Sequence, residues 1–192
     1  MKDSILGQIR KNKPDLVELP KIPVFNTKEV LVDTFVDSLK EVGAKVVRCS
    51  SNLDIEAQIK IHFPEAIRIV NTISHLGIKG LDLNTIDHPR ELHPLDLSII
   101  QGSFGVIENG AIWINPDSLK TRAIPFIGEH LVIVLDQADV VSNMHEAYAR
   151  LEKDDAGYGV FIAGPSKTAD IEQCLVIGAQ GARSLLVVIK DF

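Results

Sequence analysis

Cysteine is scarce in this sequence, and its scarcity limits the metal and disulfide chemistry that the chain can support. The 192 residues include two cysteines, Cys49 and Cys174, and no CxxC pair. Two thiols cannot supply the four ligands of an iron–sulfur cluster, and without CxxC pairs the usual structural zinc motifs are excluded. Both cysteines fall where core residues are expected, so we expect buried free thiols in a reducing compartment.

Long apolar runs and an excess of basic residues are also missing. The longest apolar runs, Leu131 to Leu135 and Leu185 to Ile189, have the length of strands, whereas a membrane helix needs roughly 20 residues. The N-terminal residues lack the continuous apolar segment of a secretory signal. A net charge of -6 argues against general nucleic-acid binding, which requires a basic face. We therefore expect a soluble, cytoplasmic protein with no membrane span and no nucleic-acid partner.

The sequence does contain an alternation of strand-like and helix-like segments. Apolar periodicity predicts strands at 45–49, 66–70, 130–136, 159–164 and 184–190, and helices at 2–11, from the Thr27 cap to Gly43, at 53–63, 138–152 and 168–179. This alternation predicts an α/β fold, a Rossmann-like, mostly parallel sheet flanked by helices. The length favours a single domain over residues 1–192, in which 1–26 form an N-terminal helix and an extended arm.

Other segments are less regular. The prolines of 12–26 predict the extended arm, and 71–94 is predicted to be mostly loop. Three β-rich runs between 96 and 115 suggest hairpins or a bent meander, and 118–127 suggests one or two helical turns. The histidines and aspartates of 87–96 match no specific ligand spacing, so we predict no metal site.

The stretch AGPSKTADIE, residues 163–172, joins a predicted strand to a predicted helix. Ser166 or Thr168 would cap that helix, and Lys167 would add positive charge beside amides that suit a phosphate or a carboxylate. Asp170 and Glu172 would stabilise the first turn by themselves and would repel an anion. An anion site and a simple capped turn both stay open.

A second stretch, ENGA at 108–111, places a carboxylate in an apolar, β-rich region. Asn-Gly is typical of a tight hairpin turn, which would leave Glu108 exposed at its edge. The alternative is that a turn at strand ends, where sites of open α/β sheets lie, presents Glu108 for acid–base or nucleophilic chemistry.

Residues 164–191, GPSKTADIEQCLVIGAQGARSLLVVIKD, resemble the C-terminal signature of the LUD-domain family, the lactate utilization protein C group. That signature has a block from glycine-proline-serine to isoleucine-glutamate, and then two glycines and a basic residue, here Gly178, Gly181 and Arg183. The segments 101–114 and 122–135 resemble earlier parts of the family pattern, so that the resemblance covers most of 95–192.

The chain departs from the family pattern at three positions. Asn109 stands where the family usually has threonine, and Gln180 and Ala182 stand where histidine and proline are frequent. These departures affect the expected shape of the last loop.

The resemblance implies the Rossmann-like fold that ribose-phosphate isomerases, glucosamine-phosphate deaminases and CoA transferases share. It also implies a bacterial component without clusters or another cofactor, which accompanies iron–sulfur proteins in oxidising L-lactate to pyruvate. The turn Glu108-Asn109-Gly110 is similar to the turn that carries the nucleophilic glutamate of CoA transferases.

We therefore expect a lactate-utilization component that binds a small anionic ligand between the Glu108 turn and the Gly164 loop. The expected ligand-binding residues are Asn109, Gly110, Arg122, Gly164, Pro165, Ser166, Lys167, Thr168, Asp170, Gly181 and Arg183, with Glu108 as the candidate catalytic group. One alternative is a structural assembly subunit without a ligand, whose arm contacts a partner. The other is a CoA- or phosphate-handling transferase that acts through Glu108.

Overall fold

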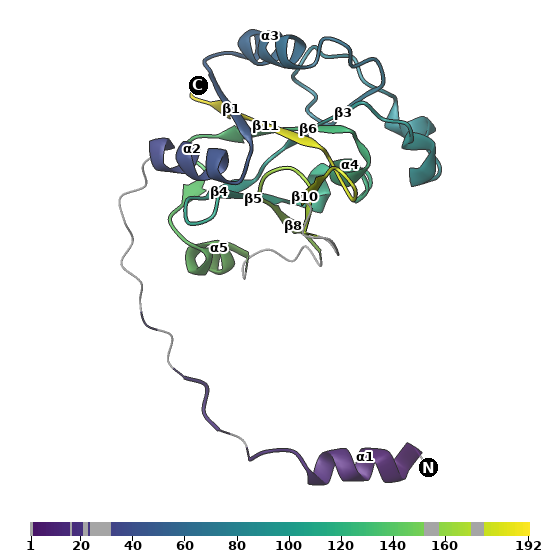
Figure 1. Cartoon of the computed structure of the whole chain (residues 1–192), viewed down its shortest axis with the longest axis vertical. Coiled ribbons are helices and arrows are strands. Elements are labelled where there is room, and N and C mark those ends of the chain that lie inside the picture. Colours follow the sequence, from purple (N-terminus) through teal and green to yellow (C-terminus); the bar gives the residue numbers. More distant parts are fainter. Residues whose placement is uncertain (1, 16, 21–22, 24–31, 152–157, 170–174) are drawn as a thin grey trace.

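The computed structural model shows an α/β fold built on a parallel sheet with helices on both of its faces (Figure 1). It describes residues 2–15, 17–20, 23, 32–151, 158–169 and 175–192. The predicted fold class is confirmed. The predicted helix cap Thr27 and the predicted core residue Cys174 lie outside the described residues.

Five strands form the central sheet in the order β1-β11-β6-β3-β2, and each neighbouring pair is parallel. They are β1 (Lys45–Cys49), β2 (Ile69–Asn71), β3 (Leu97–Gln101), β6 (His130–Asp136) and β11 (Ser184–Lys190). The predictions for β1, β6 and β11 have the observed bounds, because short runs rich in Val, Ile and Leu are typical of buried parallel strands. Since all five strands run the same way, their first residues meet at one edge, which we call the amino edge.

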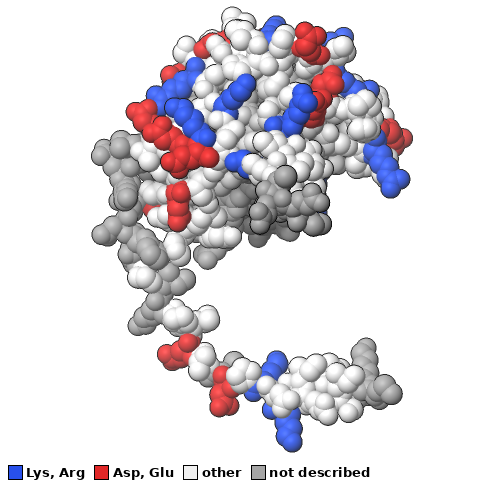
Figure 2. Space-filling view, in the orientation of Figure 1, with Lys and Arg blue, Asp and Glu red and all other residues white. Residues whose placement is uncertain are grey.

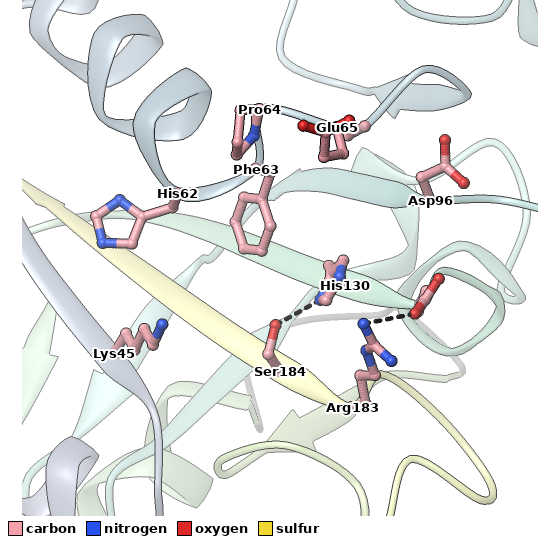
Figure 3. Close-up of a pocket in the computed structure, with 11 residues that line it drawn as sticks. Lys45, His62, Phe63, Pro64, Glu65, Asp96, His130, Arg183 and Ser184 are labelled. Carbon is pink, nitrogen blue, oxygen red and sulfur yellow. Dashed lines mark hydrogen bonds and ion pairs between the residues drawn. The ribbon is translucent and has the colours of Figure 1, made fainter.

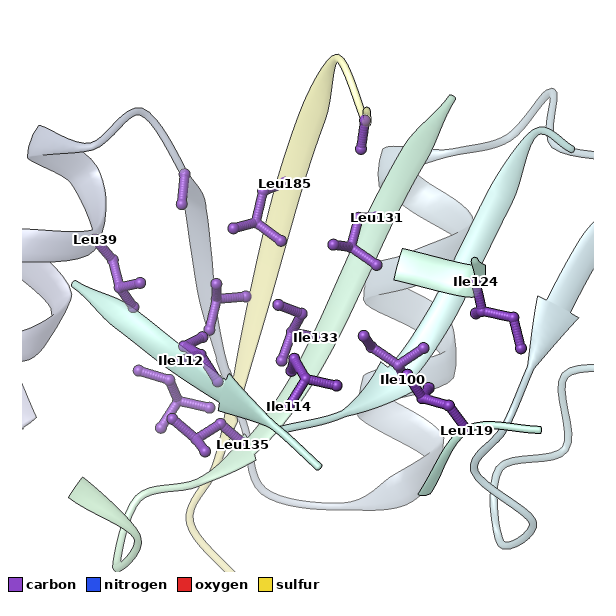
Figure 4. Close-up of a cluster of buried hydrophobic side chains, with 14 of the residues drawn as sticks. Leu39, Ile100, Ile112, Ile114, Leu119, Ile124, Leu131, Ile133, Leu135 and Leu185 are labelled. Carbon is purple, nitrogen blue, oxygen red and sulfur yellow. The ribbon is translucent and has the colours of Figure 1, made fainter. Parts of the chain in front are cut away.

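Side chains of the central strands alternate between two apolar layers. In β6, Val132 belongs to the layer under α3 (Asn52–His62), to which that helix contributes Ile55 and Ile59. Ile133 belongs to the opposite layer (Figure 4). Cys49 is a buried free thiol in the α3 layer, as expected, and burial raises its pKa to about 11.

A smaller sheet and α2 (Val32–Glu41) cover the face opposite α3. The order of the smaller sheet is β7-β4-β5-β8, with β4 (Phe104–Val106), β5 (Ala111–Ile114), β7 (Val140–Val141) and β8 (Val160–Ile162). Phe35 and Leu39 of α2 and Ile112 of β5 pack in one cluster with Ile133 of the central sheet. The apolar core therefore lies between the two sheets.

Two further helices complete the layers. In α4 (Ile124–Ile127), the backbone oxygen of Ile124 accepts a hydrogen bond of 2.7 Å from the buried hydroxyl of Ser98, which ties this short helix to β3. The helix α5 (Met144–Leu151) packs on the smaller sheet through Ala147, which clusters with Phe104.

The predicted helix at 168–179 is wrong. Instead, β9 (Lys167–Ala169) and β10 (Leu175–Ile177) form an antiparallel pair in which Val176 lies opposite Thr168. The β-branched residues Thr168, Val176 and Ile177 favour strands, and no helix begins at Ser166 or Thr168 for either residue to cap. Consequently, the helix dipole that was expected to attract an anion is not present at this loop.

Other predictions need smaller corrections. Of the β-rich runs between 96 and 115, the first is β3 of the central sheet, and the other two form the antiparallel pair β4–β5. The predicted helix at 138–152 begins later, because β7 precedes α5. Residues 71–94 are mostly loop, as expected, with two short 3-10 helices, η1 (Leu83–Thr85) and η2 (Pro89–Leu92), and a third, η3 (Pro116–Ser118), follows β5.

The N-terminal helix α1 (Lys2–Lys11) lies apart from the body of the protein in Figure 1, and Ile5, Leu6 and Ile9 are exposed on it. Residues 13–15 and 17–20 of the following arm have neither helix nor strand, as the prolines predicted. None of the described helices is long and apolar enough to cross a membrane. Acidic and basic side chains are interspersed over the face of the body in Figure 2.

Candidate functional site

The loop between β8 and β9 is held in place by close backbone contacts. Gly164 has a φ of 75°, and a Cβ at this position would overlap the carbonyl oxygen of Val42, just beyond α2. Ser166 donates its N–H to the oxygen of Ala182 at 2.8 Å, and its own oxygen accepts from the N–H of Gly178 at 3.0 Å. The loop is therefore fixed between the end of α2 and the segment that leads into β11.

A cavity of about 270 Å³, which we call the loop cavity, opens beside this loop. Pro165, Ser166, Lys167, Thr168, Gln180, Gly181 and Ala182 line its polar side, and Phe126, Leu131 and Phe161 are among the apolar residues that line the rest. Lys167 is the only charged residue among the described lining residues. Its Nζ donates to the oxygen of Val42 at 2.6 Å, which leaves two of its three N–H donors for other partners.

The Glu108 turn, between β4 and β5, has its own structural contacts. Glu108 is exposed, and its Oε2 accepts a hydrogen bond of 2.8 Å from the N–H of Met144, the first residue of α5. A carboxylate is stabilising at a helix N-terminus. Asn109 Oδ1 accepts from the N–H of Ala111 at 3.1 Å, as in a tight turn. The carboxylate of Glu108 is thus directed at α5.

The two turns approach α2 about one helical turn apart. Gly110 has a φ of 65°, and a Cβ there would lie 2.8 Å from the backbone oxygen of Ser38, whereas Gly164 packs against Val42. None of the described residues that line the loop cavity comes from the Glu108 turn. The structure brings Gly164 to Thr168 together with Gly181, and it places Glu108, Asn109 and Gly110 against other partners.

The remaining expected residues are dispersed. Arg122 stacks over the ring of Tyr158, 4.4 Å from the ring centroid. Arg183 forms an ion pair of 2.9 Å with Glu129 and lines a different cavity. Asp170 lies outside the described residues.

That different cavity has a volume of about 400 Å³ and lies at the amino edge of the central sheet (Figure 3). We call it the edge cavity. Lys45, His130 and Ser184 are the first residues of β1, β6 and β11, and His130 and Ser184 are register partners on neighbouring strands. Residues 62–66, which begin at the last residue of α3, form the facing wall.

His130 lies at the centre of the edge cavity. Its Nδ1 is 2.7 Å from Ser184 Oγ, and its ring centroid is 4.9 Å from that of Phe63. Partial burial lowers the pKa of His130, the positive charge of Arg183 lowers it further, and Glu129 and Asp96 oppose the shift. The imidazole is therefore neutral at neutral pH, and its Nδ1 can donate a hydrogen bond to the serine hydroxyl or accept one from it.

Asp96 holds the start of β3 at the same edge. Its Oδ2 accepts hydrogen bonds of 2.8 Å from the N–H groups of Ile67 and Arg68. These two bonds lower the pKa of Asp96, so that it stays charged at neutral pH. Among the described residues, no group of three or more His, Cys, Asp or Glu side chains is placed to hold a metal ion.

We expect His130 to make the protein less stable as the pH falls below about 6.5, the ordinary pKa of histidine. The unfolded imidazole takes up a proton near that pH, whereas the folded site, with its lowered pKa, resists protonation until lower pH. This loss of stability therefore develops between the ordinary and the lowered pKa. Urea unfolding of wild type and His130→Gln at about pH 7.5 and pH 5 measures it, and the variant should lose less stability on acidification.

The matched control for this experiment is His75→Gln, because His75 is an exposed histidine in the 71–94 segment. It should keep the wild-type dependence on pH. If the stability of His130→Gln depends on pH as that of wild type does, His130 does not resist protonation in the folded protein.

No role was predicted for Lys45, His130 or Ser184 from the sequence. A signal for them was available, because each is the polar first residue of a predicted apolar strand. In a parallel sheet such residues must meet at one edge. The segment 180–184 borders both cavities, since Gln180 to Ala182 line the loop cavity and Arg183 and Ser184 line the edge cavity.

Comparison with known families supports the assignment made from residues 164–191. A sequence model of the LUD domain matches residues 86–189, which is more than half of the chain. The family expected from the sequence is thereby confirmed.

Curated relatives are similar to about half of the chain or somewhat more. Lactate utilization protein C of Bacillus pumilus is 30% identical over 101 residues, which are 49% of this chain and 42% of the relative. Lactate utilization protein C of Geobacillus kaustophilus is 26% identical over 127 residues, 62% of this chain and 52% of the relative. The matched part thus spans about half the length of these relatives.

The fold is also found in a solved structure. The crystal structure of a DUF162 family protein from Deinococcus radiodurans superposes with a TM-score of 0.60 at 17% identity, over 83% of this chain and 96% of that chain. At this identity the similarity shows the fold alone.

Proposed function

The chain belongs to the LUD domain family, and we propose that it is a cytoplasmic component without iron–sulfur clusters in an L-lactate utilization system, where it binds a small anionic ligand. Relatives named lactate utilization protein C support the system. Iron–sulfur proteins that oxidise lactate to pyruvate are the partners we propose for it. The ligand would occupy the loop cavity.

The observation that carries the ligand proposal is the charge of the loop cavity. Its described lining holds one cation, Lys167, and no carboxylate, so Lys167 attracts an anion and none of the described lining residues repels it. The hydroxyls of Ser166 and Thr168 and the amide of Gln180 offer neutral hydrogen-bond donors beside it. Few polar groups in a mainly apolar concavity are typical of small-molecule sites.

The size and lining of the loop cavity favour a small ligand. A volume of about 270 Å³ fits a short carboxylate or a phosphate group with a few carbons. Because β9 begins here and no helix does, binding would depend on side chains, with Lys167 as the charged donor. Phe126 and Phe161 would contact the carbon skeleton.

We expect Lys167→Gln and Ser166→Ala to weaken binding of the anionic ligand. Losing a charge-assisted hydrogen bond costs about 1.5–3 kcal/mol, so Lys167→Gln should lower affinity roughly 10- to 100-fold, and Ser166→Ala should lower it less. A thermal-shift panel of L-lactate, pyruvate, inorganic phosphate and CoA identifies the ligand, since binding at about 100 times Kd adds roughly 2.7 kcal/mol of stability. Calorimetric titration then gives the affinities.

The controls are Lys79→Gln and Ser74→Ala, exposed positions in the 71–94 segment. They should bind like wild type. Lys167 also donates a hydrogen bond to Val42, so its substitution could loosen the loop. Melting temperatures measured without ligand show whether the variant has lost stability in addition to a ligand contact. If no member of the panel shifts the melting temperature at millimolar concentration, or if Lys167→Gln binds as wild type does, the ligand proposal is wrong.

The assembly subunit is the second candidate, and the exposed apolar side chains of the N-terminal region favour it. Ile5 and Ile9 on α1 and Val17 and Leu19 on the arm are all exposed. If Ile5→Ser/Ile9→Ser abolishes co-purification with iron–sulfur partners while Lys167→Gln leaves growth on lactate intact, the chain acts as an assembly subunit. A transferase acting through Glu108 would instead yield a covalent adduct on that carboxylate.

A further inference from the structure

We propose that the outer face of α3 binds the same face of a second copy of this chain, so that two copies form a dimer through an antiparallel pair of α3 helices. This inference is independent of both cavities and of the lactate proposal. It rests on the pattern of residues around Ala57, near the middle of the helix. In Figure 1, α3 lies on the outside of the body, and no other described element covers its outer face.

The helix α3 carries apolar side chains on two opposite faces. Ile55 and Ile59 are buried against the central sheet. Leu53, Ala57 and Ile61 are exposed, and the exposed fractions of Leu53 and Ile61 are as high as 77% and 68%. Because these three residues are four apart, they form one stripe along the helix, on the side away from the sheet. This outer stripe is an apolar surface that the described chain leaves uncovered.

The outer stripe is symmetric about Ala57, and this symmetry selects a second copy as its partner. Leu53 precedes Ala57 by four residues, and Ile61 follows it by four. When two copies are related by a two-fold axis that crosses the helices at Ala57, Leu53 of each copy lies beside Ile61 of the other. Ridges of residues four apart then interdigitate, as in the commonest class of helix packing. The two Ala57 side chains meet at the axis, where their small size lets the helices approach closely.

The polar residues that flank the outer stripe are also complementary between two copies. By helical spacing, Glu56 and Lys60 lie on one flank, and Asp54 and Gln58 lie on the other. Antiparallel pairing reverses the order of the residues on each flank, so that Lys60 meets Glu56 of the other copy and Asp54 meets its Gln58. The N–H of Gly77 donates to Glu56 Oε1 at 2.6 Å, which fixes this carboxylate, and Lys60 is exposed. The charges therefore favour the same pairing as the apolar residues do.

The size of the contact predicts a weak dimer. The helix α3 has 11 residues, which span about 16 Å. A contact between two such helices buries less than the roughly 800 Å² per partner of a standard interface. We therefore expect a dissociation constant of about 10–100 μM for the dimer.

Sedimentation velocity of the full chain, from about 1 μM to about 500 μM, tests the dimer directly. The wild-type chain should change from monomer to dimer over this range. Ala57→Glu places two like charges at the two-fold axis and should weaken the dimer at least about tenfold. Ala149→Glu is the matched control, because Ala149 is an exposed alanine on another helix, α5, and this variant should dimerise as wild type does. Melting temperatures show that both variants fold.

Charge reversal tests the antiparallel direction of the two helices. Lys60→Glu places a carboxylate against Glu56 of the other copy and should weaken the dimer several-fold. Adding Glu56→Lys to the same chain restores an opposite-charge pair and should recover most of the affinity.

Cross-linking tests the position of the two-fold axis. A short bis-maleimide should link two copies of Ala57→Cys efficiently, because the two introduced thiols lie next to each other at the axis. Ala149→Cys and wild type are the controls and should give much less linked dimer.

Three results would overturn the inference. One is that the wild-type chain stays monomeric up to about 500 μM, in which case the outer stripe does not bind a second copy. Another is that Ala57→Glu dimerises as tightly as wild type does. The third is that Ile5→Ser/Ile9→Ser abolishes the dimer and Ala57→Glu does not, which would assign the contact to α1.

Discussion

Gly164→Ala should lower the free energy of unfolding by about 2–5 kcal/mol, which combines roughly 1–2 kcal/mol for a left-handed backbone with roughly 1–3 kcal/mol for overpacking. Gly164 has a φ of 75°, and a methyl group there would overlap the oxygen of Val42. Backbone on both sides of the contact cannot move aside as a flexible side chain can. Urea denaturation monitored by circular dichroism measures the loss.

The matched control is Gly43→Ala, just beyond the C-terminal end of α2. Gly43 also has a positive φ, 88°, but the nearest atom to an added Cβ is Lys167 Nζ at 3.3 Å, the mobile end of a side chain. It should cost only about 1–2 kcal/mol, the backbone term alone. Equal losses in the two variants would mean that the approach of Gly164 to Val42 is not as close as described. Gly164→Ala should also reduce ligand binding in the loop cavity, since it displaces the loop.

Phe35→Ala should lower the free energy of unfolding by about 3–5 kcal/mol, the usual cost of removing a buried aromatic ring. Phe35 is fully buried, and its ring lies directly over Gly105 of β4, where an added Cβ would overlap the ring. The ring belongs to the cluster that joins α2 and the smaller sheet to the central sheet. Its removal leaves a cavity at the junction of three elements.

Two comparisons test the Phe35 prediction. Phe192→Ala removes a ring that is 53% exposed and should have only a small effect on stability. Gly105→Ala should destabilise wild type, but it should cost less in the Phe35→Ala background, because the added methyl group then enters the vacated space. If the costs of the two substitutions are additive, the ring does not lie against Gly105.

Parts of the fold could be predicted from the sequence because the local pattern and the final environment agree. The segments 45–49, 130–136 and 184–190 are short apolar runs, and the structure buries them in a parallel sheet. The boundary signals at Gly43 and Pro64 likewise agree with the ends of α2 and α3. At these places the local conformational preference of the chain and its long-range packing favour the same structure.

The hairpin of β9 and β10 could not be predicted in this way. The sequence at 168–179 has an apolar spacing that fits a helix, yet Val176 pairs with Thr168 across a sheet. The two-residue strand β7 is shorter than any periodic signal, and it exists because it pairs with β4. Strand pairing decided both elements, through the distant β4 for β7 and through the nearby β10 for β9, and apolar periodicity does not report strand pairing.

The two cavities likewise differ in how far the sequence indicated them. Ser166, Lys167 and Thr168 were expected to bind an anion at the start of a helix. No helix begins there, but the three residues line the loop cavity. The edge cavity was missed because sites in open α/β sheets are expected at the carboxyl ends of strands. Its residues come from strand starts that only the topology brings together.

The segment 180–184 borders both cavities, since Gly181 and Ala182 line the loop cavity and Arg183 and Ser184 line the edge cavity. A ligand that moved this segment from within one cavity would also change the lining of the other. Each ligand would then change the affinity of the other by the same factor, because the total binding free energy does not depend on the order in which the two ligands bind. Titrating a ligand of one cavity in the presence and absence of a ligand of the other would therefore measure the coupling free energy between the two sites.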